Sequence, residues 1–156
     1  MILPILASLI VTASPPAPSC TGTLSGSVRA SFTCAAEVVR DDQGHDFLVI
    51  GVKGDIEGVP SFVPGSFDVT GLLRPGVYTL EQLGFGKASV AADDRTLYTA
   101  TKTTGQRGEV TIFFSRVDPA PGGKGAPRVR GTYRARLIPA GGGKKGEVIV
   151  SVDFAT

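Results

Sequence analysis

Residues 128–139 read Arg-Val-Arg-Gly-Thr-Tyr-Arg-Ala-Arg-Leu-Ile-Pro, and residues 147–154 read Glu-Val-Ile-Val-Ser-Val-Asp-Phe. Both segments alternate apolar and polar side chains with the period of two that a half-buried β-strand requires. Between them, residues 141–146 (Gly-Gly-Gly-Lys-Lys-Gly) supply turn-forming residues. The two segments therefore predict an antiparallel hairpin with one apolar face. Because that face has to be covered by another sheet, the hairpin indicates a layered all-β domain.

The rest of the chain repeats this pattern in shorter units, and its 21 glycines and 11 prolines provide many turns. Further strands are expected at residues 29–39, 47–52, 61–63, 66–69, 77–80, 87–91, 97–101 and 110–117. The run Phe47–Val52 is apolar on both faces, which predicts a central strand that is fully buried. About nine short strands, with no substantial helix in the mature chain, predict an antiparallel β-sandwich or flattened barrel. Residues 20–156 are expected to form this single domain.

The first residues have a different character. Residues 2–11 (Ile-Leu-Pro-Ile-Leu-Ala-Ser-Leu-Ile-Val) are apolar, but the run is shorter than the roughly 20 residues that span a bilayer. Small residues and prolines follow, so residues 1–13 are expected to be a signal peptide and residues 14–19 a proline-rich stub. No Lys or Arg precedes the apolar run, which departs from the usual signal. The expected location is secreted or periplasmic, in the cell envelope, without a transmembrane helix in the mature chain.

Cys20 and Cys34 are the two cysteines of the chain. If the intervening turn centres on Ser27, residues whose numbers sum to 54 face each other, and the two cysteine Cα atoms lie roughly 4.5–5.5 Å apart. This predicts a disulfide, as is common in an oxidising compartment. The loop of about 15 residues would be stabilised by on the order of 3 kcal/mol. The alternative is a lipoprotein acylated on Cys20, although residues 17–19 (Ala-Pro-Ser) do not resemble a Leu-Ala-Gly lipobox.

Three C-terminal segments share an alternating strand pattern. They read Gly-Glu-Val-Thr-Ile (108–112), Arg-Gly-Thr-Tyr-Arg-Ala-Arg-Leu (130–137) and Gly-Glu-Val-Ile-Val-Ser-Val-Asp-Phe (146–154). In this order the segments resemble the C-terminal part of small, uncharacterised secreted or lipid-anchored β-sandwich proteins of bacteria. The resemblance covers residues 108–154 and consists mostly of strand alternation. It implies the fold and export, and it carries no activity.

The net charge of +2 conceals an asymmetry along the chain. Residues 37–94 hold ten acidic and four basic side chains, a net −6, whereas residues 95–156 hold eleven basic and four acidic side chains, a net +7. If the two halves occupy different faces, the molecule is dipolar. If the sheets interleave the halves, the fields cancel.

Few residues offer catalytic or metal-binding chemistry. The segment Asp41–Asp46 has several oxygen ligands and a glycine, but it lacks the ligand spacing of a calcium loop, so a solvated turn is expected. His45, the single histidine, lies in that turn, and no Gly-x-Ser-x-Gly motif accompanies it. A glycosidase needs two carboxylates, and the ten acids of residues 37–94 do not single out a pair. We therefore expect no catalytic residue, metal or cofactor.

The arginines of the first arm are the candidate anion-binding residues: Arg128, Arg130, Arg134 and Arg136. Alternate residues of a strand lie on one face about 6.6–7 Å apart, so the four span roughly 27 Å. Guanidinium groups bind phosphate and carboxylate in bidentate fashion, which makes an anionic glycan, lipid or protein surface the expected partner. With Leu137 opposite Val148, Asp153 lies beside Thr132 and is expected to be the main internal competitor. The alternative is an ordinary solvated face that discourages pairing with other sheets.

Taken together, these features predict an exported, non-enzymatic binding or envelope-associated module that favours anionic partners. Two other functions stay open at this point. One is a secreted hydrolase whose carboxylate pair the sequence does not identify. The other is a module that pairs a partner's strand with an uncovered sheet edge.

Overall fold

The computed structural model describes residues 17–102, 108–141 and 145–156. The predicted signal peptide (1–13) and most of the proline-rich stub (14–19) lie outside the described residues. The elements, in chain order, are β1 (Ser19–Gly26), β2 (Ala30–Arg40), β3 (Asp46–Val52), β4 (Ser61–Asp68), β5 (Gly76–Thr79), β6 (Gly86–Asp93), β7 (Thr96–Thr101), β8 (Glu109–Asp118), the short 3-10 turn η1 (Pro121–Gly123), β9 (Arg128–Pro139) and β10 (Val148–Ala155).

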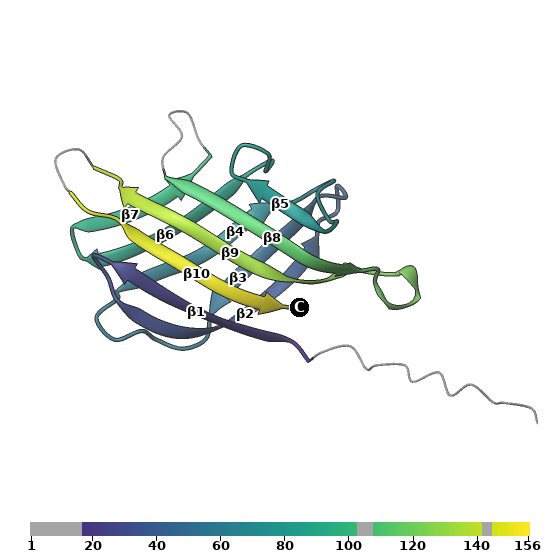
Figure 1. The fold of residues 1–156 in the computed structure, drawn as a ribbon, viewed down its shortest axis with the longest axis horizontal. Helices are drawn as coiled ribbons and strands as arrows, with labels where there is room; N and C mark the ends of the chain where they lie inside the picture. Colours follow the sequence, from purple (N-terminus) through teal and green to yellow (C-terminus); the bar gives the residue numbers. More distant parts are fainter. Residues whose placement is uncertain (1–16, 103–107, 142–144) are drawn as a thin grey trace, which may run out of the picture.

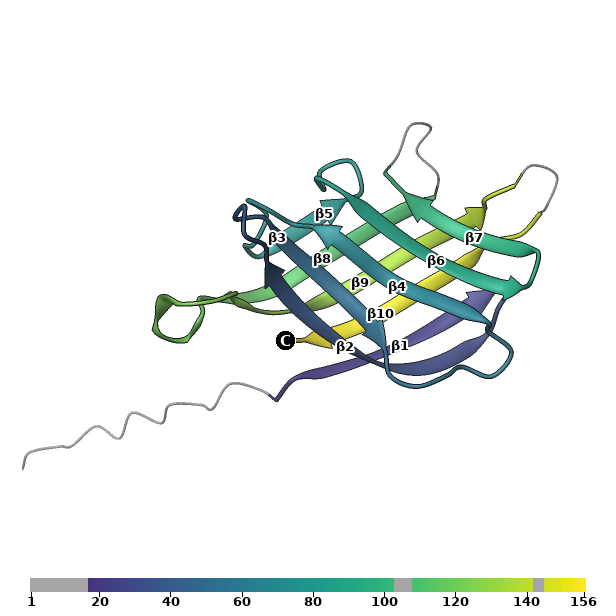
Figure 2. The ribbon, with the colours of Figure 1, turned by 180° about the vertical axis from the view of Figure 1, so that it is seen from behind.

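Eight of these strands close into a flattened barrel. The order around it is β1-β2-β3-β4-β6-β7-β9-β10, and β10 pairs back onto β1. The two remaining strands extend one wall, because β8 pairs with β9 and β5 pairs with β8. In Figure 1 the strands β5, β8, β9, β10 and β1 face the viewer, and we call them the front wall. Figure 2 shows the opposite side, the back wall of β3, β4, β6 and β7.

The all-β prediction is thus confirmed, and of the two expected architectures the flattened barrel is found and the sandwich is not. The described residues contain ten strands where about nine were expected. The sheet closes into a barrel because two long strands, β2 and β9, each pair in both walls. The strand β2 pairs with β1 through Ala30–Thr33 and with β3 through Cys34–Arg40. One edge of β9 pairs with β8, but β8 begins only opposite Arg136. Beyond that point the last residues of β9, Ile138 and Pro139, pair with β7 on the same edge and close the barrel.

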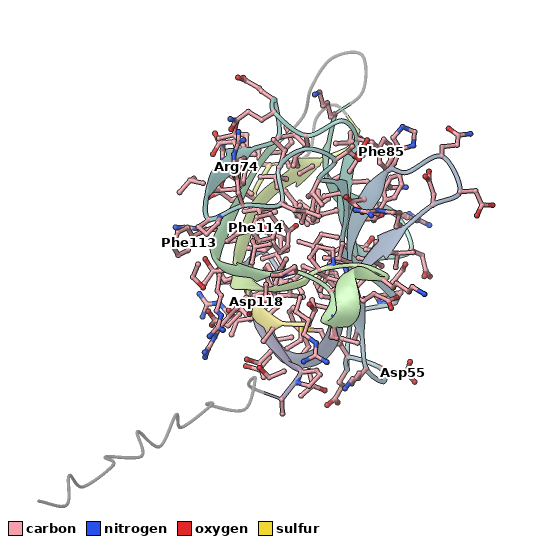
Figure 3. The ribbon with its side chains drawn as sticks, turned by 90° about the vertical axis from the view of Figure 1, so that its right-hand side faces the viewer. Asp55, Arg74, Phe85, Phe113, Phe114 and Asp118 are labelled. Atoms are coloured by element: carbon pink, nitrogen blue, oxygen red, sulfur yellow. A yellow bond between two sulfur atoms is a disulfide. The ribbon has the colours of Figure 1, made fainter. Side chains whose placement is uncertain are left out.

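The predicted C-terminal hairpin forms with the expected faces and register. Leu137 pairs with Val148, and Thr132 pairs with Asp153. The inward side chains of both strands are buried, and so are one side chain of the opposite wall, Phe67, and one of the neighbouring strand β8, Phe114. The buried residues of the two hairpin strands are Val129, Tyr133, Ala135, Leu137, Val148, Val150, Val152 and Phe154. Figure 3 shows the alternation on β8, where Phe114 points into the barrel and Phe113 points out of the front wall.

The predicted disulfide is also present. Cys20 and Cys34 are joined with an S–S distance of 2.00 Å and a Cα–Cα distance of 4.9 Å. The hairpin register is the expected one, since Thr21 pairs with Thr33 and Leu24 with Ala30. The bond lies where β2 leaves β1 to pair with β3, so it fastens the corner between the two walls.

Two local predictions are corrected. The strand β3 is not fully buried: Leu48 and Ile50 face the core, but Phe47 and Val49 on the outer face are only half-buried. The reason is that the wall of a barrel has its core on one side only. The segments expected as separate strands at 61–63 and 66–69 form one strand, β4, with a register shift between Val63 and Ser66. Pro64 lies in that gap, and proline cannot donate the ladder hydrogen bond there.

Candidate anion-binding face and groove

The four arginines predicted as a ladder share the outer face of β9. All four are exposed, while the residues between them point into the core. The strand β9 lies between β8 and β10 in the front wall, so the side chains of these two neighbours decide the charge around each arginine. The ladder is not uniform, because its two ends have different neighbours.

Arg136, at one end, is neutralised by two carboxylates. Its Nε lies 2.5 Å from Oε2 of Glu147, and its Nη1 lies 3.2 Å from Oε1 of Glu109. The hydrogen bond to Glu147 and the charges of both glutamates raise the pKa of Arg136 above its usual value. With two negative charges on one positive charge, this end of the ladder offers little to an anion.

The opposite end has an excess of positive charge. Arg130 pairs across the ladder with Arg116 of β8, and Arg128 pairs with Asp118. The carboxylate of Asp118 binds Arg116, with Nε 2.7 Å from Oδ2. Three arginines and one carboxylate therefore surround a small hollow, which is lined by residues of β8 and β9 and by the end of β10. Like charges directly opposite each other destabilise a sheet, and a bound anion would relieve that repulsion.

The middle of the ladder contains Arg134, which pairs with Thr111 on one side and with Ser151 on the other. Among the described residues no ion pair involves Arg134 or Asp153. The prediction that Asp153 is the main internal competitor of the ladder is therefore wrong. Glu147, Glu109 and Asp118 take that role because they lie at the ladder's ends, within reach of the guanidinium groups.

A groove of about 620 Å³ continues this face beyond β10. It crosses β10, β1 and β2, and the segment after β3 forms its far side. Its lining residues are Thr21, Gly22, Thr23, Ser31, Phe32, Thr33, Lys53, Asp55, Ile56, Ser151 and Asp153. Asp55 lies at the lower border of the molecule in Figure 3, well away from Phe113. The volume is within the range of about 300–1,000 Å³ that is usual for ligand sites.

The floor of the groove is rich in hydroxyl groups arranged in two rows across the strands. One row runs from Ser151 through Thr23 to Ser31, and the other from Asp153 through Thr21 to Thr33. Among the described residues, none of these side chains makes a hydrogen bond. Their donors and acceptors are therefore available to a ligand.

The sequence did not indicate Arg116 or the groove residues. The pairing of Arg116 with Arg130 depends on a register shift between Phe114 and Arg116, and alternation alone does not reveal such a bulge. The groove combines three segments, 21–33, 53–56 and 151–153, that are distant in the chain. A partial signal was the run of serine and threonine on the outward positions of β1 and β2.

In the polar turn Asp41–Asp46, the carboxylates of Asp41 and Asp46 bind groups of neighbouring residues in the chain. Asp41 accepts hydrogen bonds from the backbone N–H groups of Gln43 and His45, and its other oxygen lies 3.0 Å from Nδ1 of His45. The N–H of His45 is the main cause that lowers the pKa of Asp41. Asp46 forms a bidentate pair with Arg40. Within the described ranges, no group of three or more His, Cys, Asp or Glu side chains is arranged to hold a metal ion.

Comparisons of the chain with protein-family models, with curated proteins and with solved structures found no match. In the described part of the chain, no helix has the length and apolar character needed to cross a membrane.

Proposed function

We propose that this domain is an exported, non-catalytic binding module that holds an anionic partner on the outer face of its front wall. The observation that carries the proposal is the cluster of Arg116, Arg128 and Arg130, which line one hollow in which Asp118 is the one carboxylate among the described residues, and Asp118 pairs with Arg116. Guanidinium groups are suited to phosphate, sulfate and carboxylate because their donors form a planar fork. Arg134 extends the positive charge toward the groove.

The disulfide supports the exported part of the proposal, because such bonds persist mainly in oxidising compartments. Cys20 and Cys34 are both buried at the corner of the barrel. A disulfide-bonded Cys20 is also incompatible with acylation of its sulfur. We therefore favour a secreted or envelope-associated domain held together by this bond over one attached through lipid on Cys20.

The first experiment compares arginines of the same strand and face. Binding of heparin to the purified oxidised domain is measured across a salt series for wild type, Arg130→Ser/Arg134→Ser and Arg136→Ser. We expect the double variant to lose about tenfold or more in affinity, roughly 1.4 kcal/mol. Arg136→Ser should stay within about twofold of wild type, because Glu147 and Glu109 already neutralise that side chain.

A second control matches the charge change of the double variant elsewhere. Arg95→Ser/Lys87→Ser removes two positive charges from the β6–β7 turn and from β6 of the back wall, and it should leave binding nearly unchanged. Equal losses in both double variants would mean that only the net charge matters. If wild type shows no salt-dependent binding, the ladder is an ordinary solvated face and the proposal is wrong.

A secreted hydrolase is the second candidate, and one observation bears on it. Two carboxylates, Asp55 and Asp153, line the same groove. General acids of glycosidases are usually carboxyl groups in apolar, buried surroundings, whereas both of these side chains are exposed. The groove is therefore better suited to binding than to acid catalysis. Hydrolysis of a bound glycan by wild type, abolished in Asp55→Asn or Asp153→Asn, would reverse this preference.

Strand addition through an open edge has less support. The edge strand β5 has four residues, and one of its outward amides is already occupied, because Thr79 donates to Oε1 of Gln82 at 2.9 Å. Barrel closure pairs most other edges. The exposed edge of β5 therefore offers a partner's strand few backbone groups to pair with.

A further inference from the structure

We infer that the groove across β10, β1 and β2 binds the sugar rings of an acidic oligosaccharide whose anionic groups are held by Arg134 and Lys53. The inference rests on the proposed function and gives it a substrate class. It follows from the chemistry of the groove's floor and from the position of its charges relative to the arginine ladder.

The floor and the ladder form one continuous surface. Arg134 pairs with Ser151, Ser151 with Thr23, and Thr23 with Ser31. Neighbouring strands are about 4.7–4.9 Å apart, so a ligand that lies across them meets a hydroxyl on each strand after leaving Arg134. At the far side, the backbone N–H of Lys53 bonds to the carbonyl of Thr33, which continues the second row onto the segment after β3.

The mixture of charges distinguishes a sugar from a simple polyanion. Lys53, Asp55 and Asp153 line the groove, and Arg134 lies beside it, opposite the lining residue Ser151. A polyphosphate chain has no hydrogen-bond donors for these carboxylates and would be repelled by them. Sugar hydroxyls both donate and accept, so they match carboxylate acceptors and the serine and threonine hydroxyls alike.

A flat anionic membrane is the main competing partner. The outer face carries an apolar pair near the ladder, because Val77 and Phe113 face each other across β5 and β8 and are 58% and 41% exposed. A lipid surface would use this pair and Arg130 but would not reach the floor of a recessed groove. The free hydrogen-bonding groups of that floor are better explained by a ligand that enters it.

The test measures the affinities of a heparin tetrasaccharide and of inorganic polyphosphate of matched charge. Wild type should prefer heparin. Thr23→Val/Thr33→Val should weaken heparin about tenfold, since each lost hydrogen bond contributes about 0.5–1.5 kcal/mol, and should leave polyphosphate unchanged. Valine keeps the β-branched shape at exposed strand positions, so the fold is retained. The matched control, Ser66→Val/Thr101→Val, lies on β4 and β7 of the back wall, away from the groove, and should have no effect.

Asp153→Asn provides an independent readout. It should raise the affinity for polyphosphate by removing a repulsive charge, and so reduce the preference for heparin. If Arg130→Ser/Arg134→Ser abolishes binding but none of the groove variants alters the preference, the inference is wrong while the proposed function stands. If wild type binds phosphatidylglycerol vesicles more tightly than heparin, and Phe113→Ser loses that binding, the partner is a lipid surface and not a glycan. Absence of binding to every anion would overturn both the inference and the proposed function.

Discussion

At Tyr133 the fold buries a hydroxyl group that has no hydrogen-bond partner among the described residues. The side chain is 1% exposed, and its ring packs 5.1 Å from that of Phe67. A buried polar group without a partner costs about 1–3 kcal/mol. The aromatic ring stabilises the core, whereas the hydroxyl does the opposite.

We therefore expect Tyr133→Phe to raise the free energy of unfolding by about 1–3 kcal/mol, measured by urea denaturation. Burial also raises the pKa of Tyr133 well above 10.0, so the native state keeps its proton where the unfolded chain loses it. Stability consequently falls as pH rises above about 10, and Tyr133→Phe should flatten that decline. A variant less stable than wild type would show that the hydroxyl has a partner.

At the scale of the element, the β1–β2 hairpin depends on its disulfide. The bond closes a loop with a sequence separation of 14 at the corner where β2 changes partners. Cys34→Ser is expected to lower the free energy of unfolding by about 2–5 kcal/mol. The matching measurement on wild type is denaturation with and without reductant. Alkylation of both cysteines without reduction, detected by intact mass, would contradict the bond.

The strand β9 contains a second element-scale constraint at Gly131. This residue pairs with Phe114 on one side and Phe154 on the other, whose rings meet edge to face with centroids 6.3 Å apart. A Cβ at this position would collide with the carbonyl oxygen of Phe113. Because that oxygen belongs to the backbone at the β8 bulge, a side-chain rotation does not remove the collision.

Gly131→Ala should therefore destabilise the domain by about 1–3 kcal/mol. The control is Gly51→Ala in β3, where no atom lies within 4 Å of the added Cβ. There the loss of backbone freedom in the unfolded chain should leave stability unchanged or raise it by up to about 1 kcal/mol. Thermal or urea denaturation of the two variants decides the comparison, and equal effects would contradict a backbone collision at Gly131.

At the scale of the whole molecule, the two oppositely charged halves of the chain are largely separated. Residues 37–94 include β3, β4 and β6 of the back wall, and residues 95–156 include β8, β9 and β10 of the front wall. Two strands are exceptions: β5 of the acidic half lies in the front wall, and β7 of the basic half lies in the back wall. Of the two outcomes considered from sequence, a dipolar molecule is therefore favoured over cancellation. Its field would attract a polyanion to the front wall over the Debye length of about 8 Å at physiological salt.

Features that depend on residues close together in the chain could be predicted from the sequence. Alternation assigned the faces of β9 and β10, a short turn set the register that joins Cys20 to Cys34, and the hairpin loop placed Leu137 opposite Val148. The sequence also identified the exposed arginines of β9. These features follow from the period of two in a strand and from the geometry of short connections.

The pairing of strands that are distant in the chain could not be predicted in this way. Pairing of β1 with β10, and of β9 with β7, closes the barrel; it also leaves β3 with an outer face that the apolar run did not predict. The same long-range pairing sets Arg116 against Arg130 and assembles the groove from three separate segments. Alternation gives the same signal whichever strand lies alongside, and a single bulge shifts the register. Which residues come together in the candidate site therefore depends on how the strands pair in the closed barrel.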